Sequence, residues 1–249
     1  LSLSGSFYSR FVQEAVEYAL EKNVPVVAAA GNRHKYYDNA YPAAFPGVIS
    51  VGAVKSDKTK TDFSTKGSHV FLAAPGQGIY STVPPVTTGK EYDSYKGTSM
   101  ATPFVSGAIA LLKAKWSELD INGIHAQLKK TVEDLATSGW DPETGWGLLD
   151  LGAALAGDEP LENDLFGTLE VNVVDKDGKS VPYAKVFLAG ENRKLGTMTY
   201  EDGKVLFMAQ PAGNYTIEAS KDGLRCKVEA TITAGQSSPV TITLAATGE

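Results

Sequence analysis

The sequence predicts an α/β domain built on a parallel sheet, followed by a small all-β sandwich. Over residues 1–155, short buried runs alternate with amphipathic stretches, the order typical of strand–helix–strand units in a parallel sheet. Over residues 165–249, short alternating runs are separated by turn signals, which is typical of a sandwich. Residues 156–164 (AGDEPLEND) carry four carboxylates, one proline and no Lys or Arg. We therefore expect a solvated linker between two domains.

The α/β domain is expected to begin inside a strand. Residues 1–5 (LSLSG) alternate and then reach glycine, as a strand does where it enters a tight turn. We therefore expect the domain to be truncated at its N-terminus, with its first part encoded upstream. Apolar residues spaced three and four apart, and short apolar runs, then predict the remaining elements. The expected helices are 6–22, 102–116 and 121–131, and the expected strands are 24–30, 48–54 and 70–74.

The all-β domain is predicted from alternating runs and from the turns between them. DKDG, EDG, PAGN and KDG are turn signals, and we interpret their aspartates, Asp175, Asp177, Asp202 and Asp222, as turn formers rather than metal ligands. The single cysteine, Cys226, is expected on a strand as a small apolar residue. The expected strands are 168–174, 184–189, 204–208, 215–219, 227–233 and 240–244.

Composition argues against several classes of partner and site. A net charge of −6 argues against nucleic acid or an anionic membrane as the main partner. The chain has no run of 18 apolar residues, so no segment is expected to span a membrane. One cysteine rules out an internal disulfide and a multi-cysteine metal site. The three histidines, His34, His69 and His125, lie far apart and lack HExxH spacing.

Residues 96–107 (KGTSMATPFVSG) place a serine, Ser99, among small residues at the start of an apolar run. Pro103 is tolerated in the first turn of a helix, which puts the helix start near residues 99–101. A side chain there meets the positive end of the helix and unpaired backbone N–H groups, which stabilise an oxyanion. The stretch alone leaves two interpretations open: a nucleophile, or an ordinary cap of a buried helix.

Five segments together resemble the subtilisin-like serine proteases (subtilases, peptidase S8 family), and they occur in that family's order. GTSMATP followed by SGAIALL resembles the nucleophile motif, and LSLSG resembles the substrate-binding strand. AAAGN at 28–32 resembles the oxyanion-hole segment. YPAAFPGVISVGAV at 41–54 and AAPG at 73–76 resemble two further family segments. The resemblance covers residues 1–155 and implies a subtilisin-like fold and secreted serine endopeptidase activity on polypeptides, with no cofactor required for the chemistry.

The resemblance assigns the chemistry to two residues. Ser99 matches the nucleophile, which attacks the scissile carbonyl. Asn32 matches the oxyanion-hole asparagine, whose amide donates to the developing oxyanion together with the Ser99 N–H. Taken alone, Asn32 has a second interpretation, because asparagine after a strand is also common in an ordinary turn.

The family's other two catalytic residues have no counterpart in this sequence. In the family, an Asp in a DTG-like motif and a His in an HGTH-like motif precede the serine, and neither motif occurs here. We do not expect His34, His69 or His125 to act as the base. His34 lies in a polar loop where we expect it to be solvated, and His125 is expected to be partly buried or at the surface. The upstream half of the catalytic domain is expected to supply Asp and His, so these residues alone should be nearly inactive.

The resemblance also implies a peptide-binding cleft with two walls. An extended substrate is expected to bind as an added strand. Small residues on both walls leave room for a large apolar side chain, while Ser4 replaces a common glycine and narrows the approach. Arg33 is expected either at the rim, where it lets the pocket accept Glu or Asp, or in solvent. The expected walls are Ser2, Leu3, Ser4 and Gly5 on one side and Ala28, Ala29, Ala30 and Gly31 on the other.

Two further expectations come from the segment at 41–54. Tyr41–Pro42 matches a family position with a cis peptide bond. The backbone carbonyls of Ala43, Phe45 and Val48 match a weak cation site of some relatives, so a structural Ca²⁺ is expected there. No carboxylate cluster in the sequence supports tight calcium binding.

Residues 165–245 resemble a small transthyretin-like or carboxypeptidase-regulatory-like β-sandwich. The resemblance is carried by GTLEVNVVDKDGKSVPYAKVFL, TMTYEDGKVLFMAQPAGNYTIEAS and the KDG that follows. It implies a spacer, stabilising or substrate-adhesion role. One alternative to the enzyme stays open, a non-catalytic binding or adhesion protein on a degenerate protease fold. An intact Ser99 and Asn32 favour the enzyme, since a degenerate site need not keep both.

Overall fold

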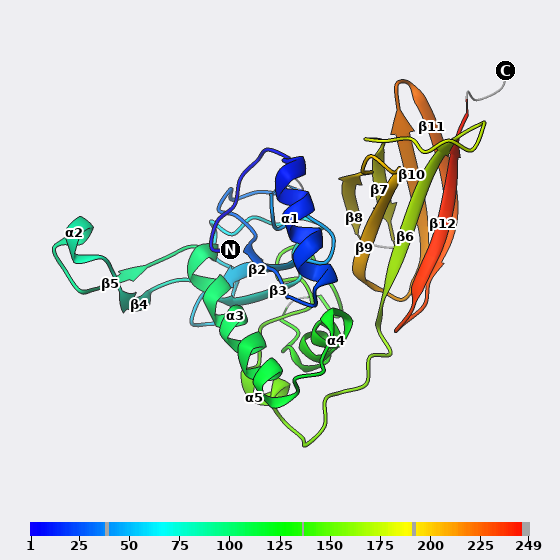
Figure 1. Ribbon diagram of the computed structural model, residues 1–249. Helices are drawn as coiled ribbons and strands as arrows, with labels where there is room; N and C mark the ends of the chain where they lie inside the picture. The colour runs from blue at the N-terminus through cyan, green and yellow to red at the C-terminus, as the bar shows by residue number, and fades with distance from the viewer. Residues whose placement is uncertain (38–39, 136, 191–192, 246–249) are drawn as a thin grey trace.

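A three-stranded parallel sheet forms the centre of the first half of the chain in the computed structural model (Figure 1). Its strands lie in the order β1 (Val27–Ala29), β2 (Ile49–Val54) and β3 (Leu72–Pro75), and all their residues except Pro75 are buried. Parallel strands covered on both faces are continuous apolar runs, which is why their sequence pattern predicts them well. The structure describes residues 1–37, 40–135, 137–190 and 193–245.

Helices cover both faces of this sheet. Helix α3 (Thr98–Lys115) packs against all three strands, and Val27 belongs to the apolar core on its side. Helix α1 (Arg10–Glu21) belongs to a second apolar cluster, which includes Ala28. Successive residues of β1 therefore face different helices, as strand geometry requires. The α/β architecture expected from the sequence is confirmed. Helices α4 (Ile121–Thr131) and α5 (Leu151–Ala154) also belong to this half.

Helix α1 is shorter than the predicted helix over residues 6–22. Ser9 is its N-cap, and the Ser9 hydroxyl accepts a hydrogen bond from the Val12 N–H at 3.4 Å. At the other end Asn23 has a φ of 57°, the left-handed conformation that terminates helices. Residues before Ser9 therefore lie outside the helix, and Phe7 is left 87% exposed.

A two-stranded hairpin that the sequence pattern did not indicate projects from the body of the first half (Figure 1). Its antiparallel strands, β4 (Ile79–Thr82) and β5 (Tyr92–Tyr95), are joined through the short helix α2 (Pro85–Thr88). The rings of Tyr80 and Tyr92 stack across the two strands with their centroids 5.7 Å apart. No residue of either strand is buried, so the in–out alternation that identifies a half-buried strand is missing.

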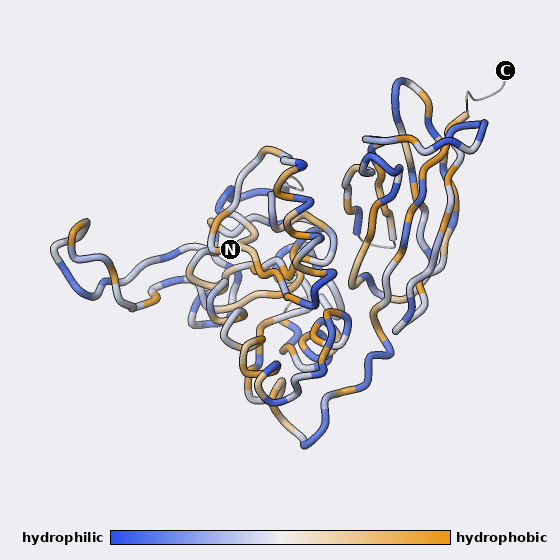
Figure 2. The backbone as a smooth tube through the Cα atoms, viewed as in Figure 1, coloured by the Kyte–Doolittle hydropathy of each residue, from blue (hydrophilic) through white to orange (hydrophobic). Residues whose placement is uncertain are grey.

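The stretch between the two halves, residues 156–164, is largely exposed, and it is also anchored to the first half. Lys115 Nζ donates to the Gly157 carbonyl at 2.5 Å, and Lys130 forms a 2.5 Å ion pair with Asp164. The stretch is predominantly hydrophilic (Figure 2). Its composition therefore describes its exposed side chains correctly, whereas its contacts depend on basic residues of α3 and α4 that are distant in sequence.

The second half of the chain is a β-sandwich, as predicted. Its strands are β6 (Phe166–Asp175), β7 (Lys185–Ala189), β8 (Lys194–Met198), β9 (Lys204–Pro211), β10 (Gly213–Lys221), β11 (Leu224–Ile232) and β12 (Ser237–Leu244). One sheet has the order β11–β10–β7–β8 and the other β12–β6–β9. Alternate residues of β6, such as Leu169 and Val171, are fully buried. The sequence analysis missed β8, because Thr197 rather than an apolar residue fills its second inward position.

Two aspartates of the sandwich turns, Asp175 and Asp202, act as turn formers, because their side chains accept hydrogen bonds from nearby backbone N–H groups. Asp175 Oδ1 accepts from the N–H groups of Asp177 and Lys179, at 2.9 Å each. Asp202 Oδ1 accepts from the Lys204 N–H at 3.0 Å. These are the local side-chain–backbone bonds that aspartate makes in turns. Cys226 lies on β11 as a free cysteine, as expected.

The two halves of the molecule contact each other where α1 meets the sandwich edge at β8 and β9 (Figure 1). Gln13 of α1 is fully buried, and its Nε2 lies 2.9 Å from Glu17 Oε1. The same nitrogen lies 3.1 Å from both the Met198 carbonyl and the Tyr200 hydroxyl. Ala209 of β9 joins the apolar cluster of α1. The contact therefore combines a buried polar network with apolar packing.

Candidate active site

Ser99 lies in the first turn of α3, but its side chain does not cap the helix. The N-cap residue is Gly97, which has no side chain to make a capping hydrogen bond. The Ser99 hydroxyl instead donates to the Ser2 carbonyl at 2.9 Å, and the Ser2 hydroxyl donates to the Ser99 carbonyl. That carbonyl is available because Pro103, four residues later, lacks the N–H that would bond to it. The cap interpretation of Ser99 is therefore wrong.

The backbone beside Ser99 leaves one donor open. The Met100 N–H donates to the Gly97 carbonyl at 3.0 Å, and the Thr98 N–H also has a partner. The Ser99 N–H makes no hydrogen bond to any described residue. It lies at the positive end of a helix of 18 residues. A negative charge developing next to the Ser99 side chain would meet a donor that is already in place.

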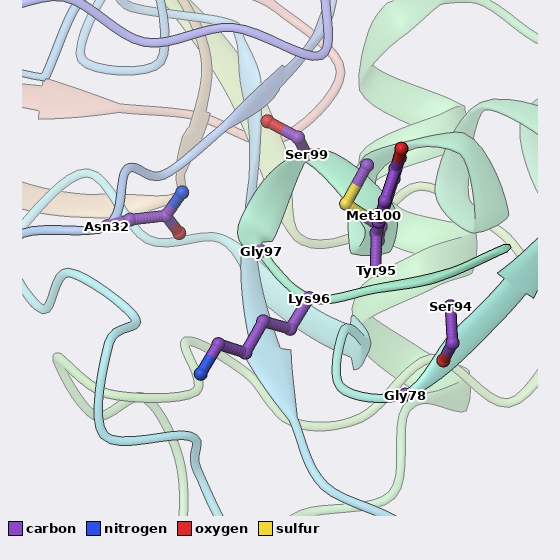
Figure 3. Close-up of a pocket in the computed structure, with 8 residues that line it drawn as sticks. All are labelled: Asn32, Gly78, Ser94, Tyr95, Lys96, Gly97, Ser99 and Met100. Atoms are coloured by element: carbon purple, nitrogen blue, oxygen red, sulfur yellow. The ribbon is translucent and has the colours of Figure 1, made fainter. Parts of the chain in front are cut away.

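Asn32 directly follows the β1 segment, and Thr98 holds its side chain. The Asn32 Oδ1 accepts hydrogen bonds from the Thr98 N–H at 3.0 Å and from the Thr98 hydroxyl at 3.1 Å. Because two donors fix the oxygen, the amide nitrogen is the outward end, and it lies on the side of the Ser99 hydroxyl (Figure 3). A Cβ on residue 97 would lie 3.4 Å from this nitrogen, so Gly97 leaves space around it. The side chain of Asn32 thus has a long-range partner.

Thr98 is the site residue that sequence reasoning missed. Its hydroxyl donates to Asn32 and accepts from the Gly31 N–H at 3.1 Å. It therefore ties the loop after β1 to the start of α3, and it is fully buried. In the sequence Thr98 is simply a possible helix cap next to Ser99. Its partners are 66 and 67 residues away, and no local pattern reveals them.

A cavity of about 580 Å³ opens beside Ser99 and Asn32 (Figure 3). Its other residues come from the base of the β4–β5 hairpin and from the start of α3. Figure 3 shows the Lys96 side chain extending away from Ser99, on the side where Asn32 lies. The residues that line the cavity are Asn32, Gly78, Ser94, Tyr95, Lys96, Gly97, Ser99 and Met100.

All three histidines have positions other than beside Ser99. His34 is exposed, and its Nδ1 lies 3.1 Å from the Asp62 carbonyl. His69 is buried, with Nε2 at 3.2 Å from the Ala30 carbonyl. His125 is 2% exposed, which corrects the expectation of a partly buried or surface residue. Burial lowers the pKa of His125 to about 4, so this residue stays neutral at physiological pH.

The two expected walls of the peptide-binding cleft lie next to each other. A Cβ on Gly31 would lie 3.1 Å from the Ser4 hydroxyl oxygen, so the two segments touch at this point. Ser2, Leu3, Ser4 and Gly5 are exposed. Their partners across the wall, Ala28, Ala29, Ala30 and Gly31, are buried. Gly5 is fixed by the Tyr41 main chain, to which it donates at 2.7 Å and from which it accepts at 2.9 Å.

Arg33 is exposed on the loop after Asn32. Its guanidinium carbon lies 4.6 Å from the ring centroid of Tyr37, a cation–π contact. The Arg33 N–H donates to the Thr65 hydroxyl at 2.9 Å, which fixes its backbone. The guanidinium therefore lies outside the cavity lining, stacked on an aromatic ring.

The segment at 41–54 contains the expected cis Tyr41–Pro42 peptide bond. The Phe45 carbonyl accepts a hydrogen bond from the Val48 N–H at 3.2 Å, which uses one of the three expected cation ligands. Across the described residues, no three His, Cys, Asp or Glu side chains are grouped so as to hold a metal ion. Within the same residues, no helix is long and apolar enough to cross a membrane.

Comparisons with known proteins agree with this geometry. A family model described as the subtilase family matches residues 1–147, and one described as a carboxypeptidase regulatory-like domain matches residues 168–245. Fervidolysin of Fervidobacterium pennivorans is 36% identical over 237 residues, which are 87% of this chain and 34% of fervidolysin. Thermitase of Thermoactinomyces vulgaris is 41% identical over 139 residues, which are 56% of this chain and 47% of thermitase.

A solved structure extends the likeness to both halves of the chain. The crystal structure of fervidolysin, described as a keratinolytic enzyme related to subtilisin, matches with a TM-score of 0.83 at 28% identity. The match covers 97% of this chain and 43% of the fervidolysin chain. This chain therefore spans less than half of the length of either relative. With the family model matching more than half of its residues, the chain belongs to the subtilase family.

Proposed function

We propose that this chain is part of a serine endopeptidase that cleaves peptide bonds in polypeptides, with residues 1–155 as the C-terminal part of the catalytic domain and Ser99 as the nucleophile. The observation that carries the proposal is the arrangement of two open donors beside Ser99. The Asn32 amide nitrogen lies on the hydroxyl side, and the Ser99 N–H has no partner among the described residues. Donors held in place before the reaction stabilise the oxyanion without reorganisation.

The proposed reaction uses these groups in a fixed order. The Ser99 oxygen attacks the scissile carbonyl, and the negative charge forms on the former carbonyl oxygen. Asn32 and the Ser99 N–H donate to that oxygen, while Thr98 keeps the Asn32 amide in its donating orientation. A base must remove the hydroxyl proton, because a neutral serine is a weak nucleophile. The present acceptor, the Ser2 carbonyl, is not such a base.

The triad Asp and His are proposed to come from a part of the catalytic domain outside these residues. Two observations support this. None of the three histidines contacts Ser99. An apolar hollow of about 650 Å³ lies between α1, β1 and α3, and Phe11 on its edge is 80% exposed. A surface of this kind normally marks a contact with other protein, and the upstream half of the domain is the occupant we propose.

The proposed substrate is an extended polypeptide that lies along residues 1–5. These residues are exposed next to Ser99, and the buried alanines of 28–30 form the opposite wall. Main-chain pairing would provide affinity for any sequence, and the small side chains would admit a large apolar residue. Nucleic acid and membranes are not part of the proposed set of partners.

Arg33 is proposed to extend the cleft's preference to acidic side chains at the cleaved position. Its exposed guanidinium on the loop after Asn32 supports this, although the contact with Tyr37 must be released. Peptides with Phe, Leu or Glu before the cleaved bond should separate the effect. We expect Arg33→Ala to reduce cleavage after Glu about two- to fivefold and to leave cleavage after Phe and Leu unchanged. Equal rates of cleavage after Glu by the wild type and by Arg33→Ala would show that Arg33 does not take part in the cleft.

Three further properties belong to the same proposal. The enzyme acts outside the cell, as expected for a protease of this family. The carbonyls of Ala43, Phe45 and Val48 would hold a weak structural cation such as Ca²⁺, although the Phe45 carbonyl already accepts a hydrogen bond from the Val48 N–H. The sandwich acts as a fixed spacer or stabiliser, because it docks on α1 through the buried Gln13.

Labelling with a fluorophosphonate probe tests the nucleophile. The full-length protein is expected to react at Ser99, and Ser99→Ala is expected to lose all labelling. Ser106→Ala is the matched control, because Ser106 is on the same helix and its hydroxyl donates to the Thr102 carbonyl at 3.3 Å. Persistent labelling of Ser99→Ala would refute the assignment. A full-length protein that neither labels nor cleaves any peptide would instead support a non-catalytic binding role.

A further inference from the structure

The cavity beside Ser99 carries a cation on its wall. Lys96 is exposed there, three residues before Ser99. We propose that Lys96 makes this cavity select a carboxylate side chain, Glu or Asp, at the first or second residue after the cleaved bond. The inference rests on the proposed endopeptidase function and names the substrate class of that site, polypeptides that are acidic on the leaving-group side.

The position of the cavity indicates which half of the substrate it receives. Ser2 contacts Ser99 through two hydrogen bonds, so residues 1–5 lie on one flank of the nucleophile. No residue of 1–5 or 28–31 lines the cavity, which therefore lies on a different flank. In the proposed function the acyl half of the substrate occupies the flank of residues 1–5. Two hollows border Ser99 on its other flanks, and we assign the leaving half to the one that contains Lys96, because it also contains Asn32, the proposed oxyanion donor.

Lys96 has no carboxylate of its own among the residues that the structure describes. No ion pair of Lys96 is found there. The carboxylate of Asp93, three residues earlier, lies 3.4 Å from Lys90 Nζ and accepts from the Ser94 N–H at 2.8 Å. Asp93 lines an adjoining hollow of about 400 Å³ between the hairpin and α3, which shares Tyr95, Ser99 and Met100 with the Lys96 cavity, and Asp93 is not among the residues that line the Lys96 cavity itself. The charge of Lys96 is therefore available to a substrate.

The rest of the cavity wall does not oppose an acidic side chain. The other lining residues are neutral, and two of them, Gly78 and Gly97, have no side chain that would occupy the space. The Ser94 hydroxyl lies on the far side of the cavity from Asn32 (Figure 3) and offers a second donor. A single cation in a partly enclosed site selects charge by direct attraction.

Matched peptide substrates test the proposal on the full-length enzyme. Internally quenched peptides should differ only at the first or second residue after the cleaved bond, which is Glu, Gln or Lys. We expect kcat/KM for Glu to exceed that for Gln by about two- to fivefold at low ionic strength, the range for an exposed charge pair. This preference should disappear in Lys96→Gln and reverse in Lys96→Glu. It should also decline at 1 M salt, because salt screens exposed charges.

Control variants separate the effect of Lys96 from net charge and from Arg33. Lys179→Gln removes one positive charge from an exposed sandwich turn and is expected to keep the full preference. Arg33→Ala should alter selection before the cleaved bond and leave selection after it unchanged. Cleavage with no preference for Glu, or a preference that survives Lys96→Gln, would overturn the proposal. Absence of any cleavage together with absence of fluorophosphonate labelling would instead refute the endopeptidase function.

Discussion

The surroundings of Ser99 and the contact between α1 and the sandwich both assemble polar groups from distant parts of the chain. Around Ser99 the assembly stops short of completion, because the Asn32 amide nitrogen and the Ser99 N–H have no partner among the described residues. Around Gln13 the assembly is complete, with three acceptors near one amide nitrogen. A donor that is buried without a partner costs stability, whereas the exposed amide of Asn32 can meet water until a ligand accepts its hydrogen bond.

Under the proposed function, the comparison explains why the donors beside Ser99 stay open while those around Gln13 are paired. A donor in an active site must stay unpaired until the oxyanion forms, so Thr98 binds only the oxygen end of Asn32. At the interface, an unpaired donor would be buried for the life of the protein. Met198 and Tyr200 prevent this by facing Gln13 from the sandwich.

Removal of the Asn32 amide, the open donor of a side chain, should have the largest effect, a fall in kcat. We expect Asn32→Ala to lower kcat by about 10²- to 10³-fold, the cost of losing one oxyanion-hole donor, with little change in KM. Steady-state kinetics of the full-length enzyme on one peptide measures this. Asn214→Ala changes an asparagine of the sandwich and should leave kcat as it is. A fall of less than about tenfold in Asn32→Ala would show that the amide does not serve the transition state.

The buried network of Gln13 and Glu17 should make the stability of the folded protein depend on pH. Burial raises the pKa of Glu17 to about 7, although hydrogen bonds from Tyr200 and Gln13 act in the opposite direction. The unfolded carboxyl titrates near 4.5, so the folded state binds more protons between about pH 4.5 and 7. Stability is therefore greatest below this window and falls as pH rises through it. We expect Glu17→Gln to be the more stable protein at pH 8, by up to about 3 kcal/mol.

Denaturant unfolding of the full-length protein between pH 5 and 8 measures this effect, in a Ser99→Ala background that prevents self-cleavage. Glu118→Gln removes an exposed carboxylate from the segment between α3 and α4, away from Glu17, and serves as the control. Parallel pH profiles for the parent and Glu17→Gln would show that Glu17 does not carry the dependence.

Loss of the orienting hydroxyl should have the smallest effect. Thr98→Ala removes one of the two hydrogen bonds to Asn32 Oδ1 and keeps the bond from the backbone N–H. We expect kcat to fall about fivefold, the value of one hydrogen bond. Thr98→Ser keeps the hydroxyl and should recover most of the rate. If Thr98→Ser were as slow as Thr98→Ala, packing of the Thr98 methyl group rather than the hydrogen bond would account for the loss.

Local pattern determined much of this protein. The continuous apolar runs of β1, β2 and β3 and the alternation of β6 reflect how strands bury their faces, so the sequence alone predicts an α/β half and a β-sandwich half. The stretch around Ser99 indicates a helix start with open N–H groups, since glycine and proline act on the backbone next to them. These inferences need no information about distant residues.

The tertiary structure decided everything that depends on partners far along the chain. The Ser99 hydroxyl bonds to the Ser2 carbonyl, 97 residues away, and does not cap its helix. The Asn32 side chain is oriented by Thr98, 66 residues away. His125 is buried although it lies on a polar-looking helix, and residues 156–164 are anchored although their composition is that of a solvated linker. Side-chain orientation and burial are set by packing between elements, and the spacing of residues within one element carries no record of it.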